Sequence, residues 1–182
     1  MLEVLPCSNA PRTVAVLLHP SIVPVIDVFR SLDLLEDQYD LALLDGPEHG
    51  LTAHTGPDAA KAIVSDALLL AFALTRQRGR PFSYRPVGSR HGSLDEFCLL
   101  TLIASSRNLA SDLAVDAATL LDVASLHFMG ALTGEIVRHM DAGGLVFVLP
   151  SLPEFRAMMG TGSSEEVLVE AAPGKVGRNL RH

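Results

Sequence analysis

The sequence predicts an α/β fold in three layers, a helix-rich domain around a small, mostly parallel sheet. Three observations predict it: the apolar runs "TVAVLLH" at 13–19 and "LVFVLP" at 145–150, and helical spacing of apolar residues through much of the chain between them. Continuous short apolar runs are typical of strands buried on both faces. The 182 residues fit one domain, so we expect a single domain over 1–182 with a frayed basic tail from about 173 to 182.

The first expected unit is strand, helix, strand. After the strand at 13–19, Ser21 can cap a helix, and Pro24 falls in its first turn, where proline is tolerated. Its apolar positions lie on one face, at Ile22, Val25, Ile26, Phe29 and Leu32. "YDLALLDG" at 39–46 is expected to be the second strand, and the Gly- and Pro-rich segment 46–58 a loop.

This order over the first 56 residues is similar to the opening of flavodoxin-like and DJ-1-like domains. The resemblance implies a flavodoxin-like or Rossmann-like fold. The reactive cysteine elbow of DJ-1-like proteins has no counterpart in these residues, so no activity follows from it.

The remaining elements are mainly helices. Residues 57–81 predict one long helix, because Pro57 and Asp58 suit its first turn and Gly79 and Pro81 its end; a short helix followed by a strand at 67–74 is the alternative. "PFSYRPVG" at 81–88 is a candidate edge strand. Further helices are expected from 94 to 105 behind a Ser93–Glu96 capping box, after Asn108, from Gly130 or Gly134 to Gly143, and from Ser151 to Gly160, with a last edge-like strand at 165–171.

Charge is distributed unevenly along the chain. The net charge is −7, from 14 basic and 21 acidic residues, which argues against nucleic-acid binding. Segment 75–93 nevertheless holds five arginines and no acidic residue: Arg76, Arg78, Arg80, Arg85 and Arg90. This segment is therefore expected to form a cationic island on an anionic protein.

Two interpretations of these arginines are open. Arginines near a helix C-terminus complement its dipole, and arginines in loops are ordinary solvated residues. Alternatively, guanidinium groups bind carboxylate or phosphate through paired hydrogen bonds. Phe82 and Tyr84 are too few aromatics for a single-strand stacking platform. The leading hypothesis is a non-catalytic regulatory or accessory domain that binds an anionic small molecule or an acidic protein segment through the five arginines.

The second hypothesis is an acid/base enzyme acting on a small molecule. In open parallel sheets, ligands bind beyond the carboxyl ends of the strands. His19 and Ser21, Asp45, and Ser151 would lie there, with His19 or His49 as acid/base and Asp45 as the orienting carboxylate. Ser21 and Ser151 are equally well explained as helix caps, and no glycine-rich phosphate loop accompanies them. We assign Ser21 and Ser151 to the ligand site with the arginines.

The other chemical signals are weak. Glu48, His49 and His54 match no established metal-site spacing, so no metal is predicted, and the cofactor is unknown. Cys98 is expected to be a buried, inert thiol. Reduced cysteines predict a cytoplasmic protein, and the apolar run at 67–74 is too short to span a membrane. Apolar residues at 128–132 and 157–159 leave a homodimer open.

Overall fold

Helices, and not a central parallel sheet, form the framework of this protein. The structure is a computed structural model, and it describes residues 16–38 and 40–160. Within them, the strands are β1 (Val16–Leu17) and β2 (His91–Gly92), which pair antiparallel with Val16 opposite Gly92. The predicted three-layer α/β fold, flavodoxin-like or Rossmann-like, is therefore wrong.

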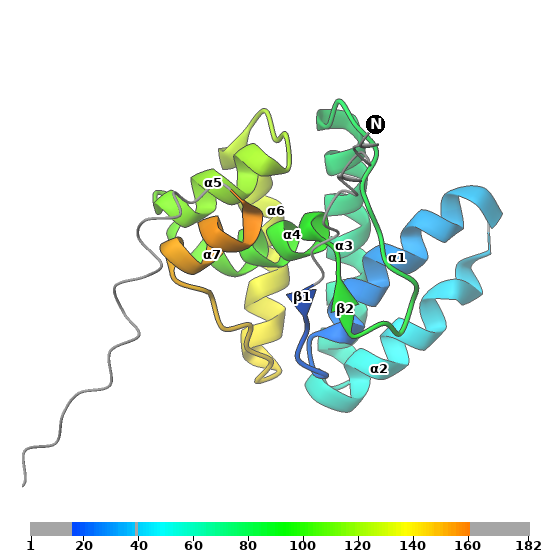
Figure 1. The fold of residues 1–182 in the computed structure, drawn as a ribbon. Coiled ribbons are helices and arrows are strands. Elements are labelled where there is room, and N and C mark those ends of the chain that lie inside the picture. The colour runs from blue at the N-terminus through cyan, green and yellow to red at the C-terminus, as the bar shows by residue number, and fades with distance from the viewer. Residues whose placement is uncertain (1–15, 39, 161–182) are drawn as a thin grey trace, which may run out of the picture. The chain divides into compact units, whose positions relative to one another are not determined.

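Most helical elements follow one another with short connections, but a long segment that includes β2 joins the helix ending at Gln77 to the helix beginning at Leu94 (Figure 1). In chain order the helical elements are α1 (Val23–Gln38), η1 (Leu41–Leu44), α2 (Asp45–Thr55), α3 (Pro57–Gln77), α4 (Leu94–Ser105), η2 (Ser106–Asn108), α5 (Asp112–Leu120), α6 (Leu126–Ala142) and α7 (Leu152–Met159). Contacts divide the chain into two compact units, Met1–Leu149 and Pro150–His182. The first unit holds every element up to α6, and α7 belongs to the second.

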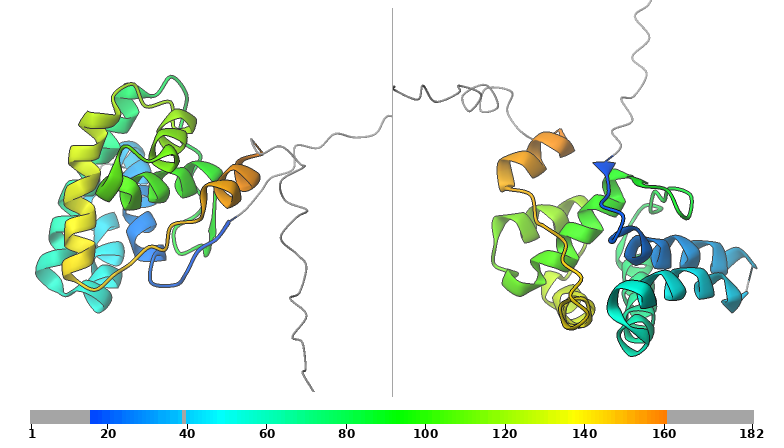
Figure 2. Two further views of the ribbon diagram at one scale, coloured as in Figure 1. Left: turned by 90° about the vertical axis from the view of Figure 1, so that its left-hand side faces the viewer. Right: turned by 90° about the horizontal axis from the view of Figure 1, so that it is seen from below.

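Helix α4 is the core of the first unit. All its residues from Asp95 to Ser105 are buried, and its apolar residues outnumber its polar ones. A helix that is apolar on every side must be covered on every side. Helices α5 and α6 pack against it, α3 and α6 lie side by side, and α1 and α2 form a pair that contacts α3 (Figures 1 and 2).

Of the strand predicted at 13–19, only Val16 and Leu17 form a strand among the described residues. Residues 13–15 lie outside the described residues. Leu17 is 64% exposed, so β1 is not a strand buried on both faces. Its partner is β2, which follows the arginine segment, and the pairing is antiparallel.

Segment 41–55 is helical where a strand and a loop were predicted. Leu41–Leu44 form the 3-10 helix η1, with the Asp40 side chain accepting from the Ala42 amide at 3.0 Å. Helix α2 begins at Asp45, so Gly46 and Pro47 fall in its first turn. Proline is tolerated there because its missing N–H would lack an intrahelical partner anyway. A four-residue apolar run between turn residues does not distinguish a strand from a helical turn.

Two other predicted strands are also absent from the described residues. "LVFVLP" at 145–150 has no regular secondary structure, with Val146 60% and Val148 82% exposed. "PFSYRPVG" at 81–88 is an irregular segment. The predicted strand at 165–171 and the tail at 173–182 lie outside the described residues.

The helix boundaries predicted for α3, α4 and α7 are largely confirmed. Helix α3 runs unbroken from Pro57 to Gln77, which excludes the alternative strand at 67–74. Helix α4 follows a complete capping box between Ser93 and Glu96, and Ser151 caps α7, which Gly160 ends in a left-handed conformation. The caps of the two helices between them were placed wrongly: Ser111, not Asn108, caps α5, and Ser125 caps α6, upstream of both predicted glycines.

Among the described residues, no helix combines the length and the apolar character that crossing a membrane requires. Cys98 is buried as predicted, and burial raises its pKa to about 12.

Candidate anion-binding site

A buried arginine on α1 binds the backbone near the end of the arginine-rich segment 75–93. Arg30, on α1, is 1% exposed, and its Nε and Nη2 donate to the two carboxylate oxygens of Glu96 at 2.7 and 3.0 Å. Its Nη1 donates to Asp27 at 2.9 Å and to the carbonyl of Ser89 at 2.8 Å, and Nη2 also donates to the carbonyl of His91. Arg30 therefore joins α1 to α4 through Glu96. It also holds the backbone at Ser89 and His91.

Glu96 and Asp27 also accept hydrogen bonds from backbone amides of segment 75–93. The amide of Arg85 donates to Glu96 Oε1 at 2.9 Å, and the amide of Gly88 donates to Asp27 at 3.0 Å. Burial raises the pKa of Asp27, and the Gly88 amide and Arg30 only partly oppose that rise. Segment 85–91 is thus held by side chains at both ends, although only its last residue, His91, belongs to a strand.

A third acid, Asp95, accepts hydrogen bonds from residues 78–83 of the arginine-rich segment. Arg80 donates to both of its oxygens, at 3.0 and 2.7 Å, Arg78 donates to Oδ2 at 3.0 Å, and the Ser83 amide donates to the same oxygen at 2.9 Å. Burial by itself would raise the pKa of Asp95, but these donors and the two positive charges outweigh it, so the pKa lies below its ordinary value. Asp95 is therefore an ionised, buried anchor for the turn after α3.

A cavity of about 380 Å³ opens between this turn and the helices α1 and α3. Its volume is in the range of small-molecule sites, roughly 300–1,000 Å³. We call it the arginine pocket, and it is lined by Leu32, Asp33, Ala71, Leu74, Thr75, Arg78, Gly79, Arg80, Pro81, Phe82 and Tyr84.

Arg78 is the most distinctive group of the arginine pocket. Its side chain is 2% exposed, and its guanidinium carbon lies 4.7 Å from the centre of the Phe82 ring. Nη2 and Nε donate to Asp95 and to backbone carbonyls, but the buried Nη1 has no hydrogen-bond partner among the described residues. A buried guanidinium donor without an acceptor costs free energy.

Two aromatic rings form one part of the pocket lining. Phe82 and Tyr84 stack with their centroids 4.4 Å apart and their planes 25° apart. The Arg78 guanidinium also lies over the Phe82 ring, so aromatic side chains and a positive charge are in contact here. Such a combination suits a planar ligand with an acidic group.

The structure brings only some of the five arginines together. Arg78 and Arg80 share Asp95 and line the arginine pocket. Arg76 is exposed on the last turn of α3, with its guanidinium 4.5 Å from the Phe72 ring. Arg85 and Arg90 do not line the pocket, although Nε of Arg85 is buried without a hydrogen-bond partner among the described residues.

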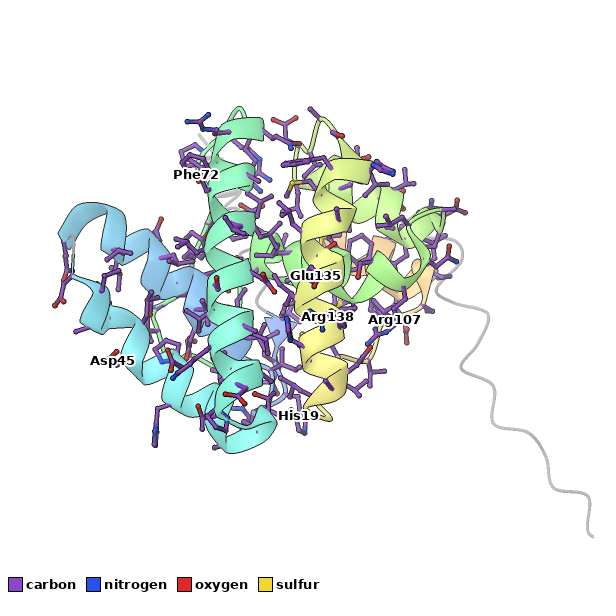
Figure 3. All side chains as sticks on the ribbon, turned by 180° about the vertical axis from the view of Figure 1, so that it is seen from behind. His19, Asp45, Phe72, Arg107, Glu135 and Arg138 are labelled. Carbon is purple, nitrogen blue, oxygen red and sulfur yellow. The ribbon has the colours of Figure 1, made fainter. Side chains whose placement is uncertain are left out.

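Of the residues assigned to strand ends, those in the first unit are only partly brought together. His19 Nδ1 lies 2.8 Å from Ser21 Oγ on an exposed turn, whereas Asp45 begins α2 and lies well away from His19 (Figure 3). His49 is exposed on α2. Ser151 belongs to the second unit, where its side chain accepts from the Glu154 amide as the cap of α7.

Sequence reasoning missed the acids and the arginine that build the site. Arg30 lies four positions after Ile26, on the face expected to be apolar, and a charge at such a position signals a buried ion pair. Asp95 and Glu96 open a helix that is apolar throughout, which is a similar signal. A comparison of this chain with protein-family models, with curated proteins and with solved structures finds no match.

Proposed function

We propose that this protein is a non-catalytic regulatory or accessory helical domain that binds an anionic small molecule in the arginine pocket. The observation that carries the proposal is Arg78, a buried guanidinium that lines the pocket and whose Nη1 has no acceptor among the described residues. Carboxylate and phosphate oxygens are the acceptors that suit a guanidinium best.

Guanidinium donor geometry, and not net charge, supports a ligand with a single acidic group, because the charges of Arg78, Arg80, Asp95 and Asp33 sum to zero. Arg78 and Arg80 share the one carboxylate of Asp95, so these three groups carry one net positive charge. Asp33 also lines the pocket and adds one negative charge to its surface. The stacked pair Phe82 and Tyr84 would hold the planar part of such a ligand. The ligand class we propose is a planar aromatic carboxylate or monophosphate.

The shape of the site favours a small molecule over an acidic protein segment. A cavity with apolar and aromatic residues around a few polar groups is typical of small-molecule sites, whereas a protein segment would require exposed arginines along a surface. The enzyme hypothesis rested on a crevice beyond the strand ends of a parallel sheet, and the described residues form no parallel sheet.

Calorimetric titration with a set of probes tests this proposal. Benzoate, acetate, inorganic phosphate and adenosine monophosphate separate the contribution of the ring from that of the acid. We expect benzoate or the nucleotide to bind more tightly than acetate or phosphate, because stacking adds to the ion pair.

Two variants with the same chemical change make the test specific. Arg78→Lys keeps the charge but loses the planar donor fork, and it is expected to weaken binding about tenfold. Arg90→Lys makes the same change in the same segment outside the pocket and is expected to leave affinity unchanged. Equal affinities of the two variants would remove Arg78 from the site, and no binding by any probe would contradict the proposal.

A further inference from the structure

Asp66, Glu135 and His139 bring three potential metal-ligating atoms together on the face where α3 packs beside α6. Asp66 lies on α3, and Glu135 and His139 lie one turn apart on α6. One carboxylate oxygen from each acid and one ring nitrogen lie within 4.8 Å of one another. Figure 3 shows Glu135 and Arg138 on this stretch of α6, beside α3. The cluster shares no residue with the arginine pocket.

The proton on His139 can be placed from its contacts. Nη2 of Arg138 lies 2.9 Å from Nε2 of His139. A guanidinium nitrogen only donates, so Nε2 accepts and carries a lone pair. The same Nε2 lies 3.5 Å from Oδ2 of Asp66, which is buried and has no hydrogen-bond partner among the described residues. Two acceptor atoms therefore face each other with no proton between them.

This separation fits shared coordination of one ion. Zinc bonds to imidazole nitrogen and carboxylate oxygen at about 2.0–2.2 Å, and in tetrahedral geometry two such ligand atoms are about 3.4 Å apart. The observed 3.5 Å between Asp66 Oδ2 and His139 Nε2 is close to that value. Glu135 has a side chain that is 55% exposed, which leaves it free to turn its oxygen toward the same ion.

A cationic group already lies between two of the three ligands. Arg138 donates to Oε2 of Glu135 at 2.7 Å and to Nε2 of His139. Its side chain is 60% exposed, so it can leave without opening the core.

We propose that Asp66, Glu135 and His139 form a binding site for one divalent first-row transition-metal ion, of which Zn²⁺ is the best match. Two ionised carboxylates and a neutral imidazole balance the charge of the ion, and an imidazole ligand disfavours Mg²⁺ and Ca²⁺. The ion would displace Arg138 and join α3 to α6, with solvent as its fourth ligand.

Titration of the full chain with Zn²⁺ tests the site, and Co²⁺ absorption reports the coordination. We expect one Zn²⁺ per chain, visible absorption bands on Co²⁺ binding, and no competition from millimolar Mg²⁺. Since the ion binds only the folded chain, saturation should raise the melting temperature by several degrees. Failure to bind Zn²⁺ would contradict the proposal.

Four variants separate this cluster from other histidines of the chain. His139→Gln and Asp66→Asn should each weaken Zn²⁺ binding at least tenfold, whereas His127→Gln, at an exposed position of the same helix, should not change it. Arg138→Gln removes the competing cation at an exposed position and should tighten binding several-fold. Zn²⁺ binding that is equal in wild type and His139→Gln, or that is weakened by Arg138→Gln, would overturn the site.

Discussion

Two nitrogens of the Arg30 guanidinium donate to the two carboxylate oxygens of Glu96, joining α1 to α4 across 66 positions of the chain. Both side chains are at most 1% exposed. Glu96 also accepts from the amides of Arg85 and Ser93, so one carboxylate serves the ion pair, the capping box of α4 and the arginine segment. The arginine pocket depends on this pair, because the pair holds the segment that follows the pocket-lining residues.

Arg30→Met is expected to destabilise the protein by about 3–5 kcal/mol, because it leaves Glu96 buried without its counter-ion. Arg107→Met is the matched control: it removes the same group from the exposed pair with Asp141 on α6, where the loss should be at most about 1 kcal/mol. Urea unfolding of both variants measures the difference. Equal losses would mean that the Arg30–Glu96 pair contributes no more than a surface pair.

Asp95→Asn should lose stability in a pH-dependent way. The folded-state pKa of Asp95 is lowered, so its ionised form stabilises the fold at pH values above the ordinary pKa of 3.8. That contribution is lost as pH falls through the lowered pKa. The free-energy difference between wild type and Asp95→Asn should therefore be largest near neutral pH and shrink in acid. A difference that grows as pH falls from 5 to 3 would contradict the assigned direction.

The thiol of Cys98 should be unreactive in the folded protein. With a pKa of about 12, only about one thiol in ten thousand is ionised at pH 8, and the residue is buried. In a Cys7→Ser background, Ellman's reagent should label Cys98 only after denaturation. Labelling of the native protein at the rate of the denatured protein would show that α4 is accessible.

Alanine substitution should have opposite effects on stability at Gly143, which ends α6, and at Gly134, inside α6. A Cβ at Gly143 would lie 2.7 Å from the backbone Cα of Thr55, so Gly143→Ala must separate the ends of α2 and α6 and destabilise the fold. A Cβ at Gly134 meets nothing within 4 Å, so Gly134→Ala should stabilise the helix by roughly 0.5–1 kcal/mol. Thermal unfolding of both variants tests the close approach of the two helix ends.

Asp33→Asn should strengthen anion binding in the arginine pocket. Asp33 lines the cavity with a negative charge, and its removal should raise affinity about two- to fivefold, corresponding to roughly 0.5–1 kcal/mol. Asp40→Asn, on the exposed cap of η1 outside the pocket, is the control with the same change in net charge. Equal gains in the two variants would show a general charge effect instead of a local one.

Local capping signals predicted helices well, and apolar runs predicted strands poorly. The Ser93–Glu96 capping box located the start of α4, because its hydrogen bonds form within four residues. The run at 41–44 became a 3-10 helix and the run at 145–150 a segment without regular secondary structure, because strand formation depends on a distant partner that the sequence does not identify.

The sequence singled out two arginines that line the arginine pocket but not the geometry around them. Segment 75–93 was predicted to matter for its charge, and Arg78 and Arg80 do line a cavity. Their common partner Asp95 lies 15 positions after Arg80, and Arg30 lies on another helix. Such contacts follow from the packing of α1, α3 and α4, which the expected parallel sheet would have arranged differently.

The Arg78 side chain itself provides the most direct test of the proposed function. Its Nε–H and Nη–H signals can be assigned in ¹⁵N spectra by their absence from the Arg78→Lys variant, and then followed as benzoate is added. We predict a saturable downfield shift of the Arg78 Nη signals. The Tyr84 amide signal should shift with them, and the Arg90 signals should not. Arg78 signals that stay unchanged while benzoate binds, or that move no more than those of Arg90, would contradict the account.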